Sequence, residues 1–422
     1  MKVTFGRYND SFKPKQKTDS WTESVELFEQ KKYFDSYKAF VNYISDEATQ
    51  NAKLTETGEQ LQIDFIQGTK LIRTIIDLQK VIAESDIAEF AKTGIPFMRR
   101  LLELNYSLYY SRFSIKDNMI VLKFDSSIID CSPSKLFFAL KELALKADKQ
   151  DALLIKDFPV LQPVYETNKI EFPDSVKKIK YNYFKKWIEN AVQKVSVLNE
   201  NTYEGGISYI LLSAIYKLDF LLVPEGYIIN ELEKMSNQYF ANDGKSYVDK
   251  NNILKDRITK TLNEPEEKII NSFYKTISAF SVLSPTSYNT VLNVIKDNVK
   301  NVKWYIDNKH EDIALSIYEY IFGYCLYTYG MVRCVAKMFR LAMLLINFDY
   351  YKEITGDGEG YKDAEGNLNQ NVITEKINKY INEGKTEYPE LNFNISNLNF
   401  SSQLQFLSSY LKEIQTLNFN VE

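Results

Sequence analysis

Three prolines separate two kinds of hydrophobic pattern in this chain, and that change of pattern constrains its fold most. Pro159, Pro163 and Pro173 lie in the stretch DFPVLQPVYETNKIEFPD. Before this stretch, short runs alternate apolar and polar side chains as half-buried strands do, whereas the residues after it show the spacing of helices. Because proline interrupts both helices and strand pairing, we predict an α+β domain over residues 1–158, a linker over 159–178 and a larger all-α domain over 179–422.

The N-terminal domain is predicted to follow the order helix, three strands, helix, two strands, helix. The first helical region is 21–44, as one bent helix or as two short ones around the polar EQKK. The remaining expected elements are strands at 61–65, 71–76 and 80–83, a helix at 97–104, a hairpin of 106–115 with 119–125, and a helix that starts at Ser132-Pro133. Serine followed by proline is a frequent helix start, because the hydroxyl caps the first turn and proline fits its first position.

The hairpin is predicted to have two chemically different faces, because side chains alternate across a strand. The face toward the core is expected to carry Phe113, Ile115, Ile120, Leu122 and Phe124, and the opposite face Tyr109, Val121 and Lys123. If the domain binds a partner on its sheet, the second face is the expected surface.

This order of elements resembles the class I type III secretion chaperone fold and the related YbjN-like domains. The resemblance covers Trp21 to Asp151 and is clearest in PFMRRLLELNYSLYYSRFSIKDNMIVLKFDSSIIDCSPSKLFFALKELALKADKQD, where a helix ending in Leu-Asn precedes a hairpin and a further helix follows an acidic turn. It implies a non-enzymatic, acidic and often dimeric domain that binds an extended segment of a client protein along hydrophobic surface. It carries over no site residue, and the client-binding residues stay unassigned.

The composition argues against most catalytic chemistry. His310 is the single histidine, which disfavours histidine-based triads and histidine-ligated metals. The formal net charge of −4 disfavours a dedicated binder of duplex DNA. We therefore predict that the chain is not an enzyme, has no catalytic, cofactor-binding or metal-binding residues, and needs no cofactor.

Other features indicate a cytoplasmic chain. The start, MKVTFGRYNDSFKPKQK, lacks the apolar core of a signal peptide. Cys131, Cys325 and Cys334 are odd in number and irregularly spaced, so we expect reduced, packed thiols. A reactive Cys131 at the start of a helix is the alternative.

Two loops contain carboxylates that deserve comparison with known sites. The loop TGDGEGYKDAEGN carries Asp357, Glu359, Asp363 and Glu365, but its spacing departs from a calcium-binding EF-hand, so a solvated loop is the favoured interpretation. Its glycines, Gly356, Gly358 and Gly360, lack the Gly-Lys-Ser/Thr of a phosphate loop. Asp125 and Asp130 are expected at the ends of structural elements and not as an acid–base pair.

One basic and aromatic cluster opens the helical domain. It consists of Lys177, Lys178, Lys180, Lys185 and Lys186 with Tyr181, Tyr183, Phe184 and Trp187. Such a mixture can bind single-stranded nucleic acid, but the start of an amphipathic helix explains it as well, and we predict no nucleic-acid partner.

The helical domain has one run, 313–332, that is long and apolar enough to suggest a membrane span. We favour a buried central helix, and so predict no membrane partner. The expected helices are 181–198, 207–223, 227–240, 265–283, one from the cap at Ser284-Pro285 to about 307, 311–348 and 401–414.

The leading function is non-enzymatic protein binding, as a chaperone or adaptor for a client or partner protein, with a homodimer as a further option. The alternatives are a structural subunit of a larger assembly and a small-molecule binder with a pocket between the C-terminal helices.

Overall fold

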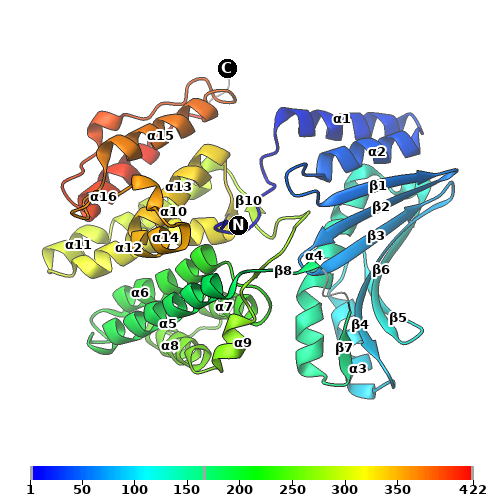
Figure 1. The fold of residues 1–422 in the computed structure, drawn as a ribbon, viewed down its shortest axis with the longest axis horizontal. Helices are drawn as coiled ribbons and strands as arrows, with labels where there is room; N and C mark the ends of the chain where they lie inside the picture. Colours follow the sequence, from blue (N-terminus) through cyan, green and yellow to red (C-terminus); the bar gives the residue numbers. More distant parts are fainter. Residues whose placement is uncertain (1–2, 165–167, 420–422) are drawn as a thin grey trace. The chain divides into compact units, whose positions relative to one another are not determined.

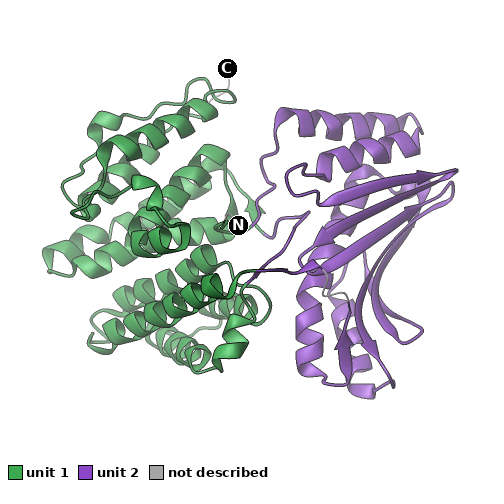
Figure 2. Ribbon diagram, in the orientation of Figure 1, with its two compact units in different colours: residues 1–7, 172–273, 283–422 green, residues 8–171, 274–282 purple. Residues whose placement is uncertain are grey.

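A computed structural model describes residues 3–164 and 168–419 of the chain. It divides into two compact units (Figure 2): unit 1 comprises 1–7, 172–273 and 283–422, and unit 2 comprises 8–171 and 274–282. Unit 2 contains a large sheet and unit 1 is mostly helical, so the α+β class expected from the sequence is confirmed.

The division into units differs from the predicted ranges 1–158, 159–178 and 179–422 in three places. The expected linker is divided between unit 2, which extends to 171, and unit 1, which resumes at 172, and two short segments change unit. Residues up to 7 belong to unit 1, and residues 274–282 belong to unit 2. Part of the expected linker, 165–167, lies outside the described residues.

The sheet of unit 2 has seven antiparallel strands in the order β1-β2-β3-β4-β6-β5, with β7 paired to β4. The strands are β1 Ala52–Thr57, β2 Gln60–Gln67, β3 Lys70–Ile76, β4 Lys80–Phe90, β5 Arg112–Lys116, β6 Met119–Ser127 and β7 Leu161–Pro163. Four strands therefore precede the next helix, where the sequence predicted three. The edge strand β1 was missed because most of its side chains are exposed and give no alternating apolar pattern.

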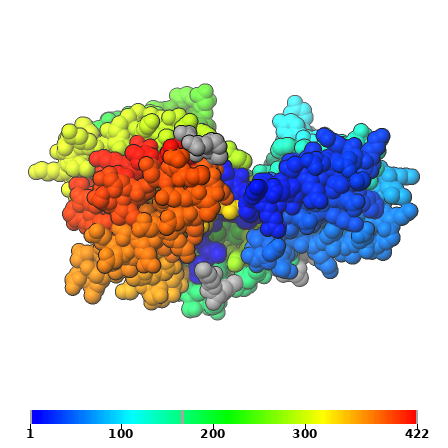
Figure 3. All heavy atoms as spheres, turned by 90° about the horizontal axis from the view of Figure 1, so that it is seen from above, coloured from blue at the N-terminus to red at the C-terminus, as the bar shows by residue number. Residues whose placement is uncertain are grey.

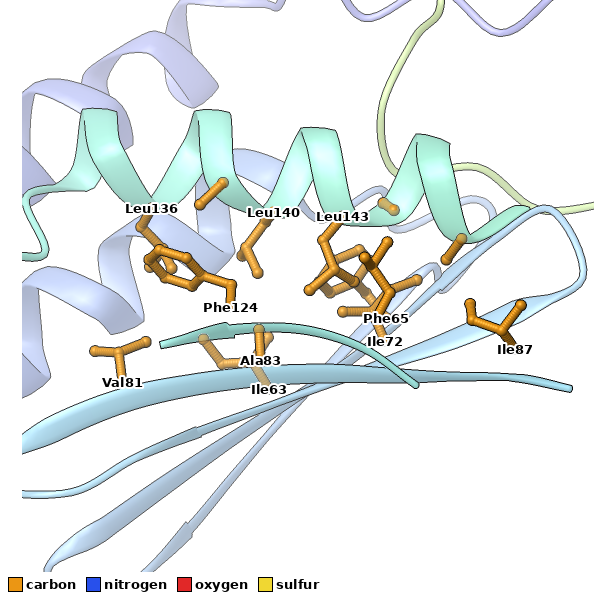
Figure 4. Packing of buried hydrophobic residues seen from close by; sticks show 14 of the residues in the cluster. Ile63, Phe65, Ile72, Val81, Ala83, Ile87, Phe124, Leu136, Leu140 and Leu143 are labelled. Atoms are coloured by element: carbon orange, nitrogen blue, oxygen red, sulfur yellow. The ribbon is translucent and has the colours of Figure 1, made fainter. Parts of the chain in front are cut away.

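Four helices complete unit 2: α1 Lys15–Glu29, α2 Tyr33–Ile44, α3 Ile95–Tyr106 and α4 Pro133–Asp157. The first expected helical region is thus two helices. The cap predicted for α4 is present, because the Ser132 side chain accepts a hydrogen bond from the N–H of Lys135. Helix α4 lies along one face of the sheet (Figure 1), and Figure 4 shows Leu136, Leu140 and Leu143 pointing down onto that face.

The core of unit 2 forms between α4 and the inner side chains of the strands. Along β2, Leu61, Ile63 and Phe65 are buried and alternate with partly exposed polar residues. Figure 4 shows Ile63, Phe65 and Ile72 beneath α4. Burial on this face therefore follows the period of two that the sequence showed.

The predicted inner face of the hairpin is right except at its tip. Phe113, Ile120, Leu122 and Phe124 belong to the core cluster, whereas Ile115 is 36% exposed. Ile115 lies on the edge strand β5, whereas its fully buried partner Ile120 lies on β6, between β5 and β4.

The predicted outer face of the hairpin needs two corrections. Tyr109 precedes the strand, because α3 continues to Tyr106 and β5 begins only at Arg112. Val121 lies outside the core cluster, as expected for the outer face, but only 1% of it is exposed.

Unit 1 contains the remaining long helices. They are α5 Asp174–Ser196, α6 Glu204–Lys217, α7 Gly226–Tyr239, α8 Tyr247–Leu262, α9 Glu266–Ile270, α10 Tyr288–Val299, α11 Val302–Asp307, α12 Glu311–Thr328, α13 Arg333–Ile346, α14 Phe348–Thr355, α15 Gln370–Gly384 and α16 Gln403–Ile414. In Figure 3, the orange and red C-terminal residues form much of the face of unit 1 that is in view.

Three predicted helices of this region were wrong in extent. The helix expected at 311–348 is broken after α12, because β11 Tyr329–Gly330 pairs in parallel with β10 Ser284–Pro285. The cap expected at Ser284-Pro285 is instead at Ser287, whose side chain accepts from the N–H of Thr290. The helix expected at 265–283 ends with α9, and most of the residues that follow are extended or irregular.

The apolar run at 313–332 folds mainly as α12, whose apolar side chains are buried. By length and composition, the described part of the chain has one stretch that would fit a membrane, Glu204–Leu222, and 83% of its apolar window is buried within the molecule. The core helix of a soluble protein has these properties, so the structure is compatible with a soluble chain.

Candidate protein-binding site

Three of the four carboxylates in the loop at 355–367, those of Asp357, Glu359 and Asp363, accept hydrogen bonds from nearby groups of the chain. Glu359 accepts hydrogen bonds from Tyr361 and Lys376, each at 2.8 Å. Burial opposes ionisation of Glu359, but these partners outweigh it and lower its pKa to about 2. Among residues 3–164 and 168–419, no group of three His, Cys, Asp or Glu side chains is placed to hold a metal ion.

The basic and aromatic cluster of α5 does not form one surface. Phe184 is fully buried, and Tyr183 and Trp187 are nearly so. Lys180 is also fully buried, and Lys178 pairs with Glu266 at 2.9 Å. These aromatic rings belong to the core of unit 1 and do not offer a platform for stacking bases.

The three cysteines are separate, free and buried. Burial raises the pKa of Cys131 and that of Cys334 to about 11 and also raises that of Cys325. Burial therefore favours the protonated thiol at all three positions. Asp125 and Asp130 are both exposed at the end of β6 and the turn after it.

The most unusual surface of unit 2 is one side of α3. Ile95, Met98, Leu102 and Tyr106 are 85%, 39%, 71% and 96% exposed, and we call these four residues the α3 stripe. Their spacing of three, four and four residues places them on one side of the helix. The other side of α3 is buried through Phe97 and Leu101, so this short helix is apolar on two sides.

Arginines border the stripe. The chain has only eight arginines among its 52 basic residues, and two of them, Arg99 and Arg100, lie on α3 itself. Arg100 pairs with Glu103, the one carboxylate of α3, at 3.3 Å, while Arg99 is exposed. Arginine and aromatic residues are enriched in protein interfaces and lysine is depleted.

Asn105 ties the end of α3 to the neighbouring strand. Its side-chain oxygen accepts from the N–H of Phe113 at 2.6 Å, and its amide donates to the carbonyl of Phe113 at 3.0 Å. The side chain thus satisfies both backbone groups of a residue in β5, as a neighbouring strand would. This contact gives a physical reason for the Leu-Asn at the end of the helix.

Glu142 of α4 fixes the loop that continues the stripe. Its carboxylate accepts from the N–H groups of Tyr109, Tyr110 and Ser111 at 2.8–2.9 Å and from the Ser111 hydroxyl at 2.8 Å. Burial acts against the charged form, but the four hydrogen bonds outweigh it, so the pKa of Glu142 is lowered. The exposed ring of Tyr109, 87% accessible, therefore projects from an ordered loop.

Sequence reasoning placed a helix at 97–104 but missed its exposed side, because it did not divide the apolar residues of the helix between a buried and an exposed side. The available signal was an excess of apolar residues in IPFMRRLLELNY, which is more than one buried face needs.

No protein-family model matches this chain, and no curated protein matches it either.

Proposed function

We propose that this chain is a cytoplasmic, non-enzymatic protein-binding protein, an adaptor or chaperone, that docks a partner protein on the α3 stripe. The observation that carries the proposal is an ordered, exposed apolar stripe bordered by arginines. Fully burying side chains of this type contributes roughly 1.5–3 kcal/mol each. Because Asn105 and Glu142 already hold this surface in one conformation, binding a partner costs little free energy for ordering the surface.

The border of the stripe favours a particular kind of partner. Arg99 is exposed, and Glu103 is already paired with Arg100 within α3. A helix or strand with apolar side chains flanked by carboxylates would match both the stripe and its positive border. Apart from the additional strand β1 and the division of the first helix, the order of elements resembles a class I type III secretion chaperone and supports a protein ligand for this unit. The buried free thiols support a reducing compartment.

The test is a comparison of two charge substitutions on the full chain. Leu102→Glu places a carboxylate in the centre of the stripe, and Leu78→Glu does so at a similarly exposed apolar residue in the turn between β3 and β4. Tagged proteins are returned to the native cell, and co-purified proteins are quantified by mass spectrometry. We expect a partner that binds the wild type and Leu78→Glu but is reduced about tenfold or more with Leu102→Glu, as loss of a central interface residue produces.

Three results would contradict the proposal. A partner retained equally by Leu102→Glu would place the binding surface elsewhere. Sedimentation of the purified protein separates a second case: a dimer that Leu102→Glu dissociates would identify the partner as a second copy of this chain. A fixed stoichiometric set of partners would favour a structural subunit.

One observation favours a small-molecule ligand as a second candidate function. Between α13 and α15 of unit 1 lies a cavity of about 310 Å³, lined among others by Arg333, Lys337, Glu383 and Tyr388. This volume lies within the range of ligand sites, although Lys337 and Glu383 already form an ion pair across it. Native mass spectrometry of protein purified from its own cell would detect a bound molecule, and a ligand-free spectrum would remove this candidate.

A further inference from the structure

A short extended segment far along the chain completes the core of unit 2. Residues 274–282 belong to this unit although most of it ends at residue 171. In the segment, β9 Tyr274–Lys275 pairs antiparallel with β8 Ile170–Glu171. Two residues further on, Ile277 forms an antiparallel bridge with Gly68. The N–H of Gly68 donates to the carbonyl of Ile277 at 2.8 Å.

A side chain of the sheet binds the backbone of the segment. The side-chain oxygen of Gln67, a residue only 3% exposed, accepts from the N–H groups of Ala279 and Phe280 at 3.1 and 2.9 Å. The ring of Phe280 is 1% exposed and lies 5.6 Å from Phe65 and 5.4 Å from Phe137, between ring centroids. One amide and one aromatic pocket thus hold two consecutive residues.

The turn that presents Gln67 is held by α4 and not by the segment. Asp148 accepts from the N–H of Thr69 at 3.1 Å, and a side chain at Gly68, where φ is +60°, would collide with its carboxylate. Asp151 pairs with the fully buried Lys70 at 2.9 Å and accepts from the Thr69 hydroxyl. Since these contacts lie within the sheet and α4, the site is formed by residues other than those it binds.

The segment is bound largely through its backbone. Apart from Ala279, Phe280 and Ser281, whose hydroxyl donates to the carbonyl of Tyr8 at 2.7 Å, the side chains from Lys275 to Val282 are partly or largely exposed. Domains that bind extended peptides work in the same way: backbone hydrogen bonds supply affinity and a pocket for one side chain supplies specificity.

We propose that Gln67, Gly68 and the pocket between Phe65 and Phe137 form a peptide-binding site, which the chain fills with its own residues 274–282. We call it the Gln67 site. The partner it fits is an extended segment of another protein with a small residue followed by Phe, the pair that Ala279 and Phe280 supply here. The inference rests on the proposed protein-binding function and adds a second surface to it.

The covalently attached segment competes with any partner. An attached ligand acts at an effective concentration in the millimolar range, so a free peptide binds measurably only when the attached segment is weakened. A substitution that weakens the attached segment is therefore expected to increase the affinity for a free peptide.

The probe is a fluorescein-labelled peptide with the sequence YKTISAFSVL, residues 274–283, titrated by anisotropy into the full-length chain. We expect Phe280→Ala to bind it roughly tenfold or more tightly than the wild type does, because the competing anchor is gone. Adding Gln67→Ala to that variant, or replacing the Phe of the peptide by Ala, should each remove the gain. Leu78→Glu serves as the control variant with wild-type behaviour.

The proposal is overturned if Phe280→Ala binds the peptide no more tightly than the wild type does. If Phe280→Ala does not fold, hydrogen exchange of the wild-type protein tests the proposal instead. The amides of Ala279 and Phe280 are expected to exchange by local opening, roughly tenfold or more faster than those of Ile120 and Leu122 in the core. If all four amides exchange at one rate, the segment leaves its site only when the whole unit unfolds, and the proposal is refuted.

The remaining outcomes are also decisive. A wild-type dimer that Phe280→Ala abolishes would show that the occupant is the segment of a second copy and not a partner protein. Capture of a partner on the α3 stripe does not involve Gln67. A failed peptide titration beside a positive Leu102→Glu comparison therefore refutes only this inference.

Discussion

Replacing Lys180 by Met is predicted to stabilise unit 1 at neutral pH. The Lys180 side chain is fully buried, donates to the carbonyl of Leu222 at 2.6 Å and lies 4.4 Å from the ring of Phe172. Burial lowers its pKa to about 7, partly opposed by Glu225. In the unfolded chain the same amine has its ordinary pKa of 10.5.

The shift of the Lys180 pKa sets the direction of the pH effect. Between about pH 7 and pH 10 the unfolded chain binds more protons at this residue than the folded chain does, so stability rises with pH. From the two pKa values, Lys180 costs about 4 kcal/mol at pH 7 and about 2 kcal/mol at pH 9. Methionine of similar length removes this cost but leaves the Leu222 carbonyl without its donor, a loss of about 1–2 kcal/mol. The net expected gain at pH 7 is about 2 kcal/mol.

The assay is urea unfolding followed by the fluorescence of Trp187, which packs against Tyr183 and Tyr350 in unit 1. Trp21 and Trp304 are replaced by Phe in both proteins so that one signal remains. The wild type should gain about 2 kcal/mol between pH 7 and pH 9 relative to Lys180→Met. Equal pH dependence in the two proteins would refute the reasoning, because Lys180 would then be solvated or charged in the folded state.

Three further predictions concern other buried groups. Arg7→Ala should cost about 3–5 kcal/mol in urea unfolding, because it leaves the buried Asp219, now 2.7 Å from Arg7, without its partner; an unchanged midpoint would contradict this. Glu142→Gln should cost about 1 kcal/mol of stability at pH 7, since solvent screens part of the interaction. Because the pKa of Glu142 is lowered in the folded state, the difference between wild type and variant should fade as pH falls through that pKa. A difference that persists in acid would contradict this prediction. The three thiols should not react with Ellman's reagent in the native protein and should all react in urea, because burial keeps them protonated; fast native labelling of Cys131 would show a reactive thiol.

Periodicity predicted those elements whose burial is one-sided. Leu61, Ile63 and Phe65 alternate with polar residues because only one face of β2 packs on α4. This alternation was enough to predict the strand. The edge strand β1 and the amphipathic helices α8 and α15, in which apolar residues are sparse, gave weaker signals and were missed. Local pattern is informative where burial is strong and regular.

The breaks in the helical unit depend on pairing between distant residues. Tyr329 and Gly330 leave the helical conformation where they pair with Ser284 and Pro285, about 45 positions earlier. Within 311–348 the break is marked only by Gly330, a weak signal because Gly323 lies inside α12 and the pattern is apolar on both sides of the break. The Gln67 site could not be predicted for the same reason. From the sequence alone, residues 274–282 were predicted to continue a helix, because their partners in the sheet are distant in the chain.

Burial of Val121 on the outer face shows how pairing changes a prediction. In the register of the sheet, Asp86, Val121 and Ser114 form one row, with Lys116 in the row on one side and Glu84 in the row on the other. The 3.1 Å ion pair between Lys116 and Glu84 therefore spans the row of Val121 and covers its side chain.

Val121→Asp is therefore predicted to destabilise unit 2, whereas an uncovered outer face would tolerate it. The new carboxylate would lie directly opposite Asp86 and compete with Glu84 for Lys116, so we expect a cost of about 2–3 kcal/mol at pH 7. Val121→Thr, similar in shape and uncharged, should cost about 1 kcal/mol. Since burial raises the pKa of a new carboxyl group, the cost of the Asp variant should shrink as pH falls toward about 4. Wild-type stability of Val121→Asp at pH 7 would show that the ion pair does not cover this row, and would restore the outer face of the sheet as a surface for an extended client.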